Sequence, residues 1–193
     1  DDDERESYMS LVEENNELLL NLISDILDIS KIEAGTVELI ITRVDVARLC
    51  REVISTCSHK KHEEAVVLRF DESSPQIMVD ADKNRIMQVL SNFITNALKF
   101  TTKGSVTLSY RLEDDGLLHF CVTDTGKGIP AEQQHEIFSR FVKLDSFSQG
   151  AGLGLSICQS LVERMGGQIG VNSREGEGSC FWFTHPYTLD ASL

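Results

Sequence analysis

The chain has 193 residues, of which 41% are hydrophobic, and its formal net charge at pH 7 is −13. This length holds one ordinary domain with an appendage, and the hydrophobic fraction argues against a disordered chain. The negative charge argues against nucleic acid as a partner, because an acidic surface repels a phosphate backbone.

A long helix is predicted over residues 8–34, after an acidic and frayed leader over residues 1–7. Its apolar residues recur at alternating steps of four and three, and further leucines and isoleucines widen this stripe beyond a two-stranded coiled coil. Gly35 suits a left-handed cap at the helix end. We expect the helix to pack in a bundle, most simply against a second copy of the chain.

The remainder mixes short helices and strands without a strict strand–helix–strand alternation. Strands are predicted at residues 37–41, 66–70, 77–79, 105–112, 117–124, 168–173 and 179–184. Helices are predicted at residues 46–57, 85–101, 131–138 and 153–165, and Asp45 and Asp82 are placed to cap the first two. The pattern predicts an α+β fold, a two-layer sandwich of one sheet with helices on one face.

No apolar run approaches the roughly 18 residues that span a bilayer, and no signal peptide is visible. We therefore expect a cytoplasmic fragment without membrane contact. The five cysteines are odd in number and lack the spacing of a metal site. We expect reduced core thiols at Cys50, Cys57, Cys121, Cys158 and Cys180.

The helix at residues 85–101 has two distinct faces. Apolar residues form the stripe that packs on a core, whereas Asn92, Asn96 and Lys99 share the other side. Two amides and an ammonium group in line can hold a metal ion and a phosphate chain. An ordinary solvated helix face has the same composition.

A second polar constellation begins where the strand at 117–124 ends. If Asp124 is buried, its carboxylate can accept a hydrogen bond from an exocyclic amine such as that of adenine, and it would oppose the carbonyl of guanine. Gly126 and Gly128 would let the backbone approach a flat ring, while Ile129 offers an apolar wall. A common Asx-turn has the same sequence.

Further glycines open the helix at 153–165. The N–H groups and the helix dipole behind Gly152 and Gly154 suit phosphates, although many helices begin after such a loop. Phenylalanines on either side of Arg140 could anchor a mobile lid by aromatic packing. Residues 176–179 predict a tight hairpin turn.

In this order the motifs resemble the catalytic and ATP-binding domain of sensor histidine kinases from two-component systems. Their N box and their first glycine, phenylalanine, second glycine and third glycine boxes are similar to residues 88–101, 124–130, 137–141, 150–155 and 176–179. The helix that ends at Gly35 resembles the second helix of the family's dimerisation and phosphoacceptor hairpin. The resemblance implies that helix at 1–35, without its first partner helix, and a Bergerat-type ATP-binding domain at 36–193.

The resemblance also implies ligands for ATP and Mg²⁺. Asn96 would coordinate Mg²⁺, Asn92 and Lys99 would contact the phosphates, and Arg140 would approach the γ-phosphate. Asp124 would bind the adenine amine. The ring would be surrounded by Gly126, Gly128 and Ile129, and the phosphate chain would be cradled by Gly152, Gly154 and Leu155.

The implied activity is that of a protein-histidine kinase whose downstream partner is a response regulator receiver domain. Related ATPases of gyrase and chaperone type carry a glutamate four residues before the metal-binding asparagine, where it activates water. Here that position is Asn92, so the site would hold ATP without hydrolysing it. The alternatives are a nucleotide-binding regulatory module without transfer activity and an ATP hydrolase of the related fold.

The phosphoacceptor of the family is a histidine on the helix that precedes the one at residues 8–34. None of the five histidines of this chain has that context. We therefore expect that the fragment does not label itself when incubated alone. The resemblance implies that the longer parent protein is anchored in the inner membrane. The sequence of residues 141–147 resembles that of hybrid members of the family.

Overall fold

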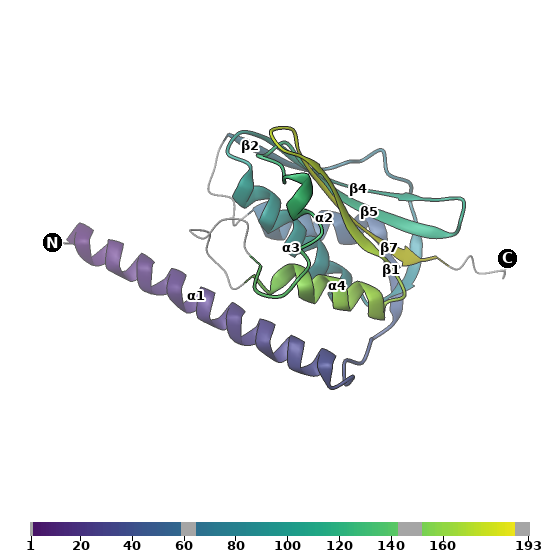
Figure 1. The fold of residues 1–193 in the computed structure, drawn as a ribbon, viewed down its shortest axis with the longest axis horizontal. Helices are drawn as coiled ribbons and strands as arrows, with labels where there is room; N and C mark the ends of the chain where they lie inside the picture. The colour runs from purple at the N-terminus through teal and green to yellow at the C-terminus, as the bar shows by residue number, and fades with distance from the viewer. Residues whose placement is uncertain (1, 59–64, 143–151, 188–193) are drawn as a thin grey trace.

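The computed structural model describes residues 2–58, 65–142 and 152–187 (Figure 1). The helices are α1 (Asp2–Glu33), α2 (Val46–Ser58), α3 (Lys83–Phe100), α4 (Gly154–Arg164) and the 3₁₀ helix η1 (Ala131–Gln133). The strands are β1 (Thr42–Asp45), β2 (Val66–Phe70), β3 (Met78–Ala81), β4 (Gly104–Leu112), β5 (Leu117–Asp124), β6 (Ile169–Arg174) and β7 (Gly178–Pro186).

Five of the strands form one sheet in the order β2-β4-β5-β7-β6. Strand β2 runs parallel to β4, and the other neighbours are antiparallel. Helices α2, α3 and α4 cover one face of this sheet, while α1 runs along the outer side of the helix layer beside α4 (Figure 1). The arrangement confirms the predicted two-layer sandwich preceded by a long helix.

The core lies between the sheet and the helix layer. Phe93 of α3 packs against Phe181 of β7 with ring centroids 5.5 Å apart, and Phe120 stacks on Phe183 at 4.7 Å. The apolar stripe predicted for α3 is buried at Ile86, Val89, Leu90, Phe93, Ile94 and Ala97. Burial of this stripe fixes the rotation of α3, so its polar face must point away from the core.

The predicted helix ends are confirmed. The Asp82 side chain accepts hydrogen bonds from two backbone N–H groups at the start of α3. Asp45 accepts one from the Arg48 N–H at 3.0 Å. Gly35 after α1 and Gly166 after α4 have φ of 67° and 80°, the left-handed conformation that glycine adopts without strain.

Three element predictions were wrong. The leader is part of α1, which begins at Asp2. Residues 37–41 are not a strand, and β1 begins at Thr42, where it pairs with β3 in a separate two-stranded sheet. In the segment predicted as a strand, the Ile40 N–H donates to Asp82 Oδ2 at 2.9 Å, so a side chain takes the place of a strand partner.

The third wrong element is the helix at 131–138, of which only η1 is regular. The Gln134 side chain donates to the carbonyl oxygens of Ile129 and Ser173, both at 2.8 Å. These bonds tie the segment to the preceding turn and to β6. The chain then continues in turns to Phe141.

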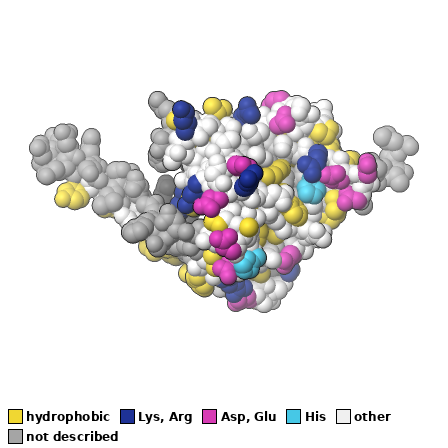
Figure 2. Space-filling model, turned by 45° about the horizontal axis from the view of Figure 1, so that its top comes forward, with side chains coloured by type: hydrophobic (Ala, Val, Ile, Leu, Met, Phe, Trp, Pro, Cys, Tyr) yellow, Lys and Arg dark blue, Asp and Glu magenta, His cyan; other side chains and the backbone are white. Residues whose placement is uncertain are grey.

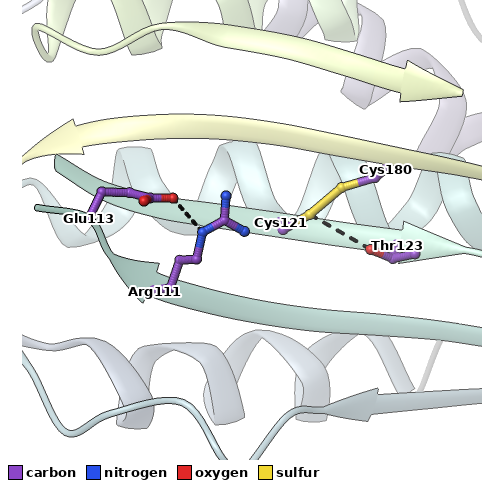
Figure 3. The surroundings of a disulfide bond; sticks show 5 residues. All are labelled: Arg111, Glu113, Cys121, Thr123 and Cys180. Atoms are coloured by element: carbon purple, nitrogen blue, oxygen red, sulfur yellow. Dashed lines mark hydrogen bonds and ion pairs between the residues drawn. A yellow bond between two sulfur atoms is a disulfide. The ribbon is translucent and has the colours of Figure 1, made fainter.

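The prediction of five reduced thiols was wrong for two of them. Cys121 on β5 and Cys180 on β7 form a disulfide with a Cα–Cα distance of 6.3 Å (Figure 3). The register pairs Cys121 with Trp182 and Cys180 with Thr123, so the two cysteines are diagonal neighbours. Their separation of 59 residues hid this proximity. The remaining cysteines, Cys50, Cys57 and Cys158, are buried and free as predicted.

Hydrogen bonds connect the C-terminal end of α1 to the helix layer. Gln88 Nε2 of α3 donates to Asp28 Oδ2 at 2.7 Å, and Arg164 Nη2 of α4 donates to the Gly35 carbonyl at 3.1 Å. Toward its N-terminus α1 extends beyond the domain (Figure 1). Exposed apolar side chains on α1 are Tyr8, Met9, Val12, Leu19, Leu20, Ile23, Ile26 and Leu27.

In the described part of the chain, no helix combines the length and the apolar character that crossing a bilayer requires.

Candidate functional site

The polar face of α3 carries the two predicted amides one helical turn apart. Asn96 Nδ2 donates to Asn92 Oδ1 at 3.0 Å, and both side chains are half-buried. Lys99 follows on the same side, exposed, with its Nζ 5.5 Å from the centre of the Phe100 ring. The structure thus brings the three side chains of the first constellation together.

The start of α4 lies directly on this amide pair. A Cβ placed on Gly154 would come within 2.3 Å of Asn92 Nδ2, so a larger residue there would displace the Asn92 amide. Leu155 follows, half-buried against the core. Leu153 precedes α4 and provides no side-chain cap for its first N–H groups. Uncapped N–H groups and the positive end of the helix dipole suit an anion beside the asparagines.

Gly152 closes the base of the segment that leads into α4. Its φ is 71°, and its carbonyl accepts a hydrogen bond from the Phe141 N–H at 3.0 Å. The expected lid at residues 143–151 lies outside the described residues. Gly152 therefore lies against Phe141 and Val142, two residues before the glycine that meets Asn92.

Asp124 ends β5 on the inner face of the sheet and is 6% exposed. Its Oδ1 accepts a hydrogen bond from the Gly126 N–H at 2.8 Å, which is the Asx-turn that the sequence allowed. Burial raises the pKa of this carboxyl group, and backbone hydrogen bonds from Gly126 and Ser179 oppose the rise. A buried carboxylate can accept a hydrogen bond from an amine, and a shifted pKa is typical of carboxyl groups in functional sites.

The turn after Asp124 packs closely against the domain at Gly126, Gly128 and Ile129. A Cβ on Gly126 would lie 2.4 Å from the Phe100 carbonyl, and a Cβ on Gly128, where φ is 68°, would lie 2.0 Å from the Arg174 carbonyl. Ile129 is 6% exposed and donates its N–H to Ser173 Oγ at 2.8 Å. The turn is therefore held between the end of α3 and the β6–β7 hairpin.

The third glycine cluster belongs to this same end of the site, which the sequence did not indicate. Ser179 pairs with Asp124 in the β5–β7 register, and its Oγ lies 2.9 Å from Ser173 Oγ. A Cβ on Gly178 would come within 2.1 Å of the Asp124 carbonyl. The hairpin turn predicted at residues 176–179 is confirmed. It also packs against Asp124.

Arg140 has a different neighbour from the one the resemblance implies. Its Nη1 donates to Glu33 Oε1 at the end of α1, 107 residues earlier in the chain. Phe138 packs against the core, as an anchor would. Phe141 does not, because it is 71% exposed and has a φ of 62°, which is uncommon for a residue other than glycine.

A metal ion at this site would need ligands beyond the protein. Within the described part of the chain, no group of three or more His, Cys, Asp or Glu side chains could hold one. The amide pair fits a Mg²⁺ ion that keeps water and phosphate oxygens as its other ligands. Lys and Arg side chains on the face seen in Figure 2 are scattered among Asp and Glu. A phosphate chain would thus be held by local groups.

Comparison with known proteins places these motifs in a family. Residues 81–189 match the model of the histidine kinase-, DNA gyrase B- and HSP90-like ATPases. The hybrid signal transduction histidine kinase B of Dictyostelium discoideum is 37% identical, over 96% of this chain and 10% of its own length. The sensor protein GacS of Pseudomonas syringae is 36% identical over 92% and 20%.

Two solved structures are also similar to this chain. Full-length ShkA in complex with AMPPNP is 38% identical with a TM-score of 0.86, covering 98% of this chain and 40% of that one. ThkA in complex with the response regulator TrrA is 29% identical with a TM-score of 0.68, covering 88% and 49%.

The chain thus spans between a tenth and a fifth of the two sequence relatives named above. The match to the family model covers more than half of the chain and contains α3, the Asp124 turn and the start of α4. The two sequence relatives are a hybrid histidine kinase and a sensor protein, and the structural neighbour ThkA is a histidine kinase. The chain therefore belongs to the histidine kinase-, DNA gyrase B- and HSP90-like ATPase family, as an ATP-binding domain of the histidine kinase type.

Proposed function

We propose that this chain is the kinase core of a two-component sensor histidine kinase, which binds Mg-ATP and donates the γ-phosphate to a histidine supplied outside the chain. The observation that carries the proposal is that both constellations are attached to α3. Asn92 and Asn96 lie within this helix, and the Asp124 turn packs on its end through Gly126. Asn96 lies four residues before the end of α3 at Phe100, which is about 6 Å along the helix axis at 1.5 Å per residue.

At the base end, Asp124 accepts a hydrogen bond from the amine of adenine. Its carboxylate has no proton to donate to the carbonyl of guanine, so the site favours adenine. The ring lies against the turn at Gly126, Gly128 and Ile129. Because this turn is already packed by the domain, the base meets a surface that needs little reorganisation on binding.

At the phosphate end, Asn96 holds Mg²⁺ through its amide oxygen, and the bound ion neutralises charge on the phosphates. Asn92 and Lys99 contact the phosphate chain from α3. Gly152, Gly154 and Leu155 bring the N–H groups of α4 beneath it. Arg140 reaches the γ-phosphate once it leaves Glu33. These groups position a loosely bonded phosphoryl group rather than form bonds to it.

The site contains no group at Asn92 that could activate water. An amide has no basicity at neutral pH, so the γ-phosphate is kept for another nucleophile. This supports transfer over hydrolysis. An acceptor hairpin supplied as a separate peptide should become labelled by this chain and ATP, while phosphate release without acceptor stays at trace rates.

We also propose the organisation expected for the family. Residues 1–35 form the second helix of a dimerisation and phosphoacceptor hairpin, and residues 36–193 form the catalytic domain. The exposed apolar side chains of α1 support pairing with a second copy. A receiver domain is proposed as the partner because a neighbour of similar fold, ThkA, was solved with a response regulator. A cytoplasmic location and a membrane anchor in a longer parent stay predictions.

Titration calorimetry with Mg-ATP tests the nucleotide site directly. Asp124→Ala and Asn96→Ala should each weaken binding by at least tenfold, because each removes a polar contact worth about 1.5–3 kcal/mol when it involves a charged partner. Asn84→Ala is the matched control, since Asn84 is an exposed asparagine on the same helix. Unchanged affinity in both site variants would refute the proposal.

The absence of self-labelling is a separate test. Incubated alone with labelled ATP, the chain should acquire no acid-labile, base-stable phosphate. Such a label on the fragment would show that one of its own histidines is an acceptor.

A further inference from the structure

Thr101, the residue directly after α3, contains a buried hydroxyl group without a partner. Its side chain is 1% exposed. Among the buried side-chain nitrogen and oxygen atoms of the described residues, Thr101 Oγ1 alone forms no hydrogen bond. Burying a hydroxyl without a partner costs free energy, and native proteins rarely keep such a group without a use for it.

This hydroxyl lies at the base end of the candidate site. A Cβ placed on Gly126 would be 2.8 Å from Thr101 Oγ1 and 2.9 Å from Asp124 Oδ1. The hydroxyl and the carboxylate therefore approach the same glycine. One of them is a donor with a hydrogen to give, and the other is an acceptor.

The carboxylate of Asp124 needs donors to stay charged where it is buried. Two backbone N–H groups, from Gly126 and Ser179, already donate to it, while burial works against the charge. A third donor would hold the carboxylate in its accepting form and fix its rotation. Thr101 is the nearby side chain with an uncommitted hydrogen.

We propose that Thr101 is a positioning residue for Asp124, and that with nucleotide bound its hydroxyl donates a hydrogen bond to that carboxylate, directly or through one water molecule. Asp124 then keeps its second oxygen for the exocyclic amine of the purine. This inference rests on the proposed ATP site and adds a residue to it. Thr101 does not touch the nucleotide itself.

A purely structural role for Thr101 makes a different prediction. If its methyl group packs and its hydroxyl is only tolerated, Thr101→Val changes nothing in ATP binding. If the hydroxyl serves Asp124, the same substitution weakens binding while the fold loses nothing, because valine has the same shape and no unpartnered polar atom. The proposal therefore predicts that Thr101→Val weakens ATP binding without lowering the stability of the fold.

The experiment compares Thr101→Val, Thr101→Ser and wild type by thermal unfolding and by Mg-ATP calorimetry. For Thr101→Val we expect an unchanged or higher melting temperature and about tenfold weaker binding. Thr101→Ser should restore affinity to within about twofold, since it keeps the donor. The matched control is Thr95→Val, because Thr95 is exposed on α3 with its hydroxyl bonded to the Ser91 carbonyl.

Two further readouts separate action through Asp124 from a general disturbance. ATP affinity of Thr101→Val should begin to fall at a higher pH than that of wild type, because its carboxylate has lost a donor. The affinity loss should also shrink for a purine riboside triphosphate that lacks the 6-amino group. An equal loss for both nucleotides, or an unshifted pH profile, would overturn the inference.

The outcomes distinguish this inference from the proposed function. Wild-type protein that fails to bind Mg-ATP refutes the proposed function. Wild-type binding together with unchanged binding by Thr101→Val overturns only the role of Thr101. A marked fall in the melting temperature of Thr101→Val would also overturn it, because the hydroxyl would then have a structural partner.

Discussion

The two ends of the candidate site differ in what holds them. At the base end, Asp124 and Ile129 are buried, and the glycines between them pack against the end of α3 and the β6–β7 hairpin. At the phosphate end, Phe141 is exposed and Arg140 pairs with α1, outside the sheet and helix layers. From this difference we expect base recognition to depend on the folded domain alone, and the phosphate contacts to depend on where α1 lies.

The difference follows from the elements that build each end. The base end is formed where β5 and β7 pair over their full length, with Asp124 opposite Ser179. The phosphate end combines the amide pair of α3 with the start of α4, where Gly152 accepts one backbone hydrogen bond from Phe141.

Reduction of the Cys121–Cys180 disulfide is expected to have the largest effect on stability and little effect on the site. The bridge spans 59 residues, so its loss should lower the free energy of unfolding by about 2–4 kcal/mol. ATP affinity should change by less than about twofold, because strand pairing holds Asp124 in place without the bridge. Urea unfolding and calorimetry with and without dithiothreitol measure both.

A Cys121→Ser/Cys180→Ser double variant is the control, since reductant should leave it unchanged. A tenfold loss of ATP affinity on reduction would contradict the comparison. The base end would then depend on a covalent link rather than on the pairing of β5 with β7.

Acidification should have opposite effects on ATP binding and on the stability contribution of Asp124. Burial raises the folded-state pKa of this carboxyl group above its unfolded value. As the pH falls through the folded pKa, Asp124 takes up a proton and ATP affinity should fall by up to about tenfold per pH unit. Its contribution to stability, fully present below the unfolded pKa, is lost as the pH rises through the folded pKa.

Calorimetry and urea unfolding between about pH 4 and 7 test both directions. In Asp124→Asn the corresponding component of each profile should be absent. ATP affinity that is flat over this range, with wild-type binding intact, would contradict a charged acceptor at the base end.

Gly154→Ala should weaken ATP binding by about tenfold while changing stability little. The new Cβ would stand 2.3 Å from Asn92 Nδ2, so the amide must turn away and the Asn92–Asn96 bond is lost. Alanine at the start of α4 should not destabilise the helix, because alanine has a higher helix propensity than glycine. Calorimetry and urea unfolding of the variant give the two quantities.

Gly176→Ala is the matched control for this substitution. Gly176 has a φ of 82° at the tip of the β6–β7 turn, with no other atom within 4 Å of its Cβ position. Alanine there should lower stability and leave ATP binding unchanged. Equal ATP affinity of Gly154→Ala and wild type would show that the amide pair does not carry the phosphate end.

Features set by neighbouring residues in the chain could be predicted from the sequence. The amphipathic stripe of α3, the caps at Asp45 and Asp82 and the stop at Gly35 depend on spacings of a few residues. The same is true of Asn92, Asn96 and Lys99 on one helix face, because helical geometry alone brings them together. The family resemblance, which rested on ordered local motifs, was confirmed for the same reason.

Features that depend on contacts across the fold were missed. The disulfide joins cysteines 59 residues apart, which are neighbours only because of the register of β5 with β7. The hydrogen bond from Ile40 to Asp82 replaced a predicted strand across 42 residues. The role proposed for the Thr101 hydroxyl depends on its closeness to Gly126, and the β4–β5 hairpin separates these two residues in the sequence. No local pattern encodes these distances.

Glu33→Gln tests the link between α1 and the phosphate end and should have the smallest effect. The Glu33 and Arg140 side chains are 57% and 45% exposed, so losing their ion pair should change the free energy of unfolding by less than about 1 kcal/mol. If Glu33 holds Arg140 away from the γ-phosphate, the substitution should raise affinity for ATP about two- to fivefold and leave affinity for ADP unchanged. The ratio of ATP affinity to ADP affinity, measured by calorimetry, cancels effects on the base end.

Glu72→Gln, which breaks the exposed Arg51–Glu72 pair, is the matched control and should leave the ratio at its wild-type value. An unchanged ratio in Glu33→Gln would mean that Arg140 does not compete between α1 and the nucleotide, and that the phosphate end is as independent of α1 as the base end.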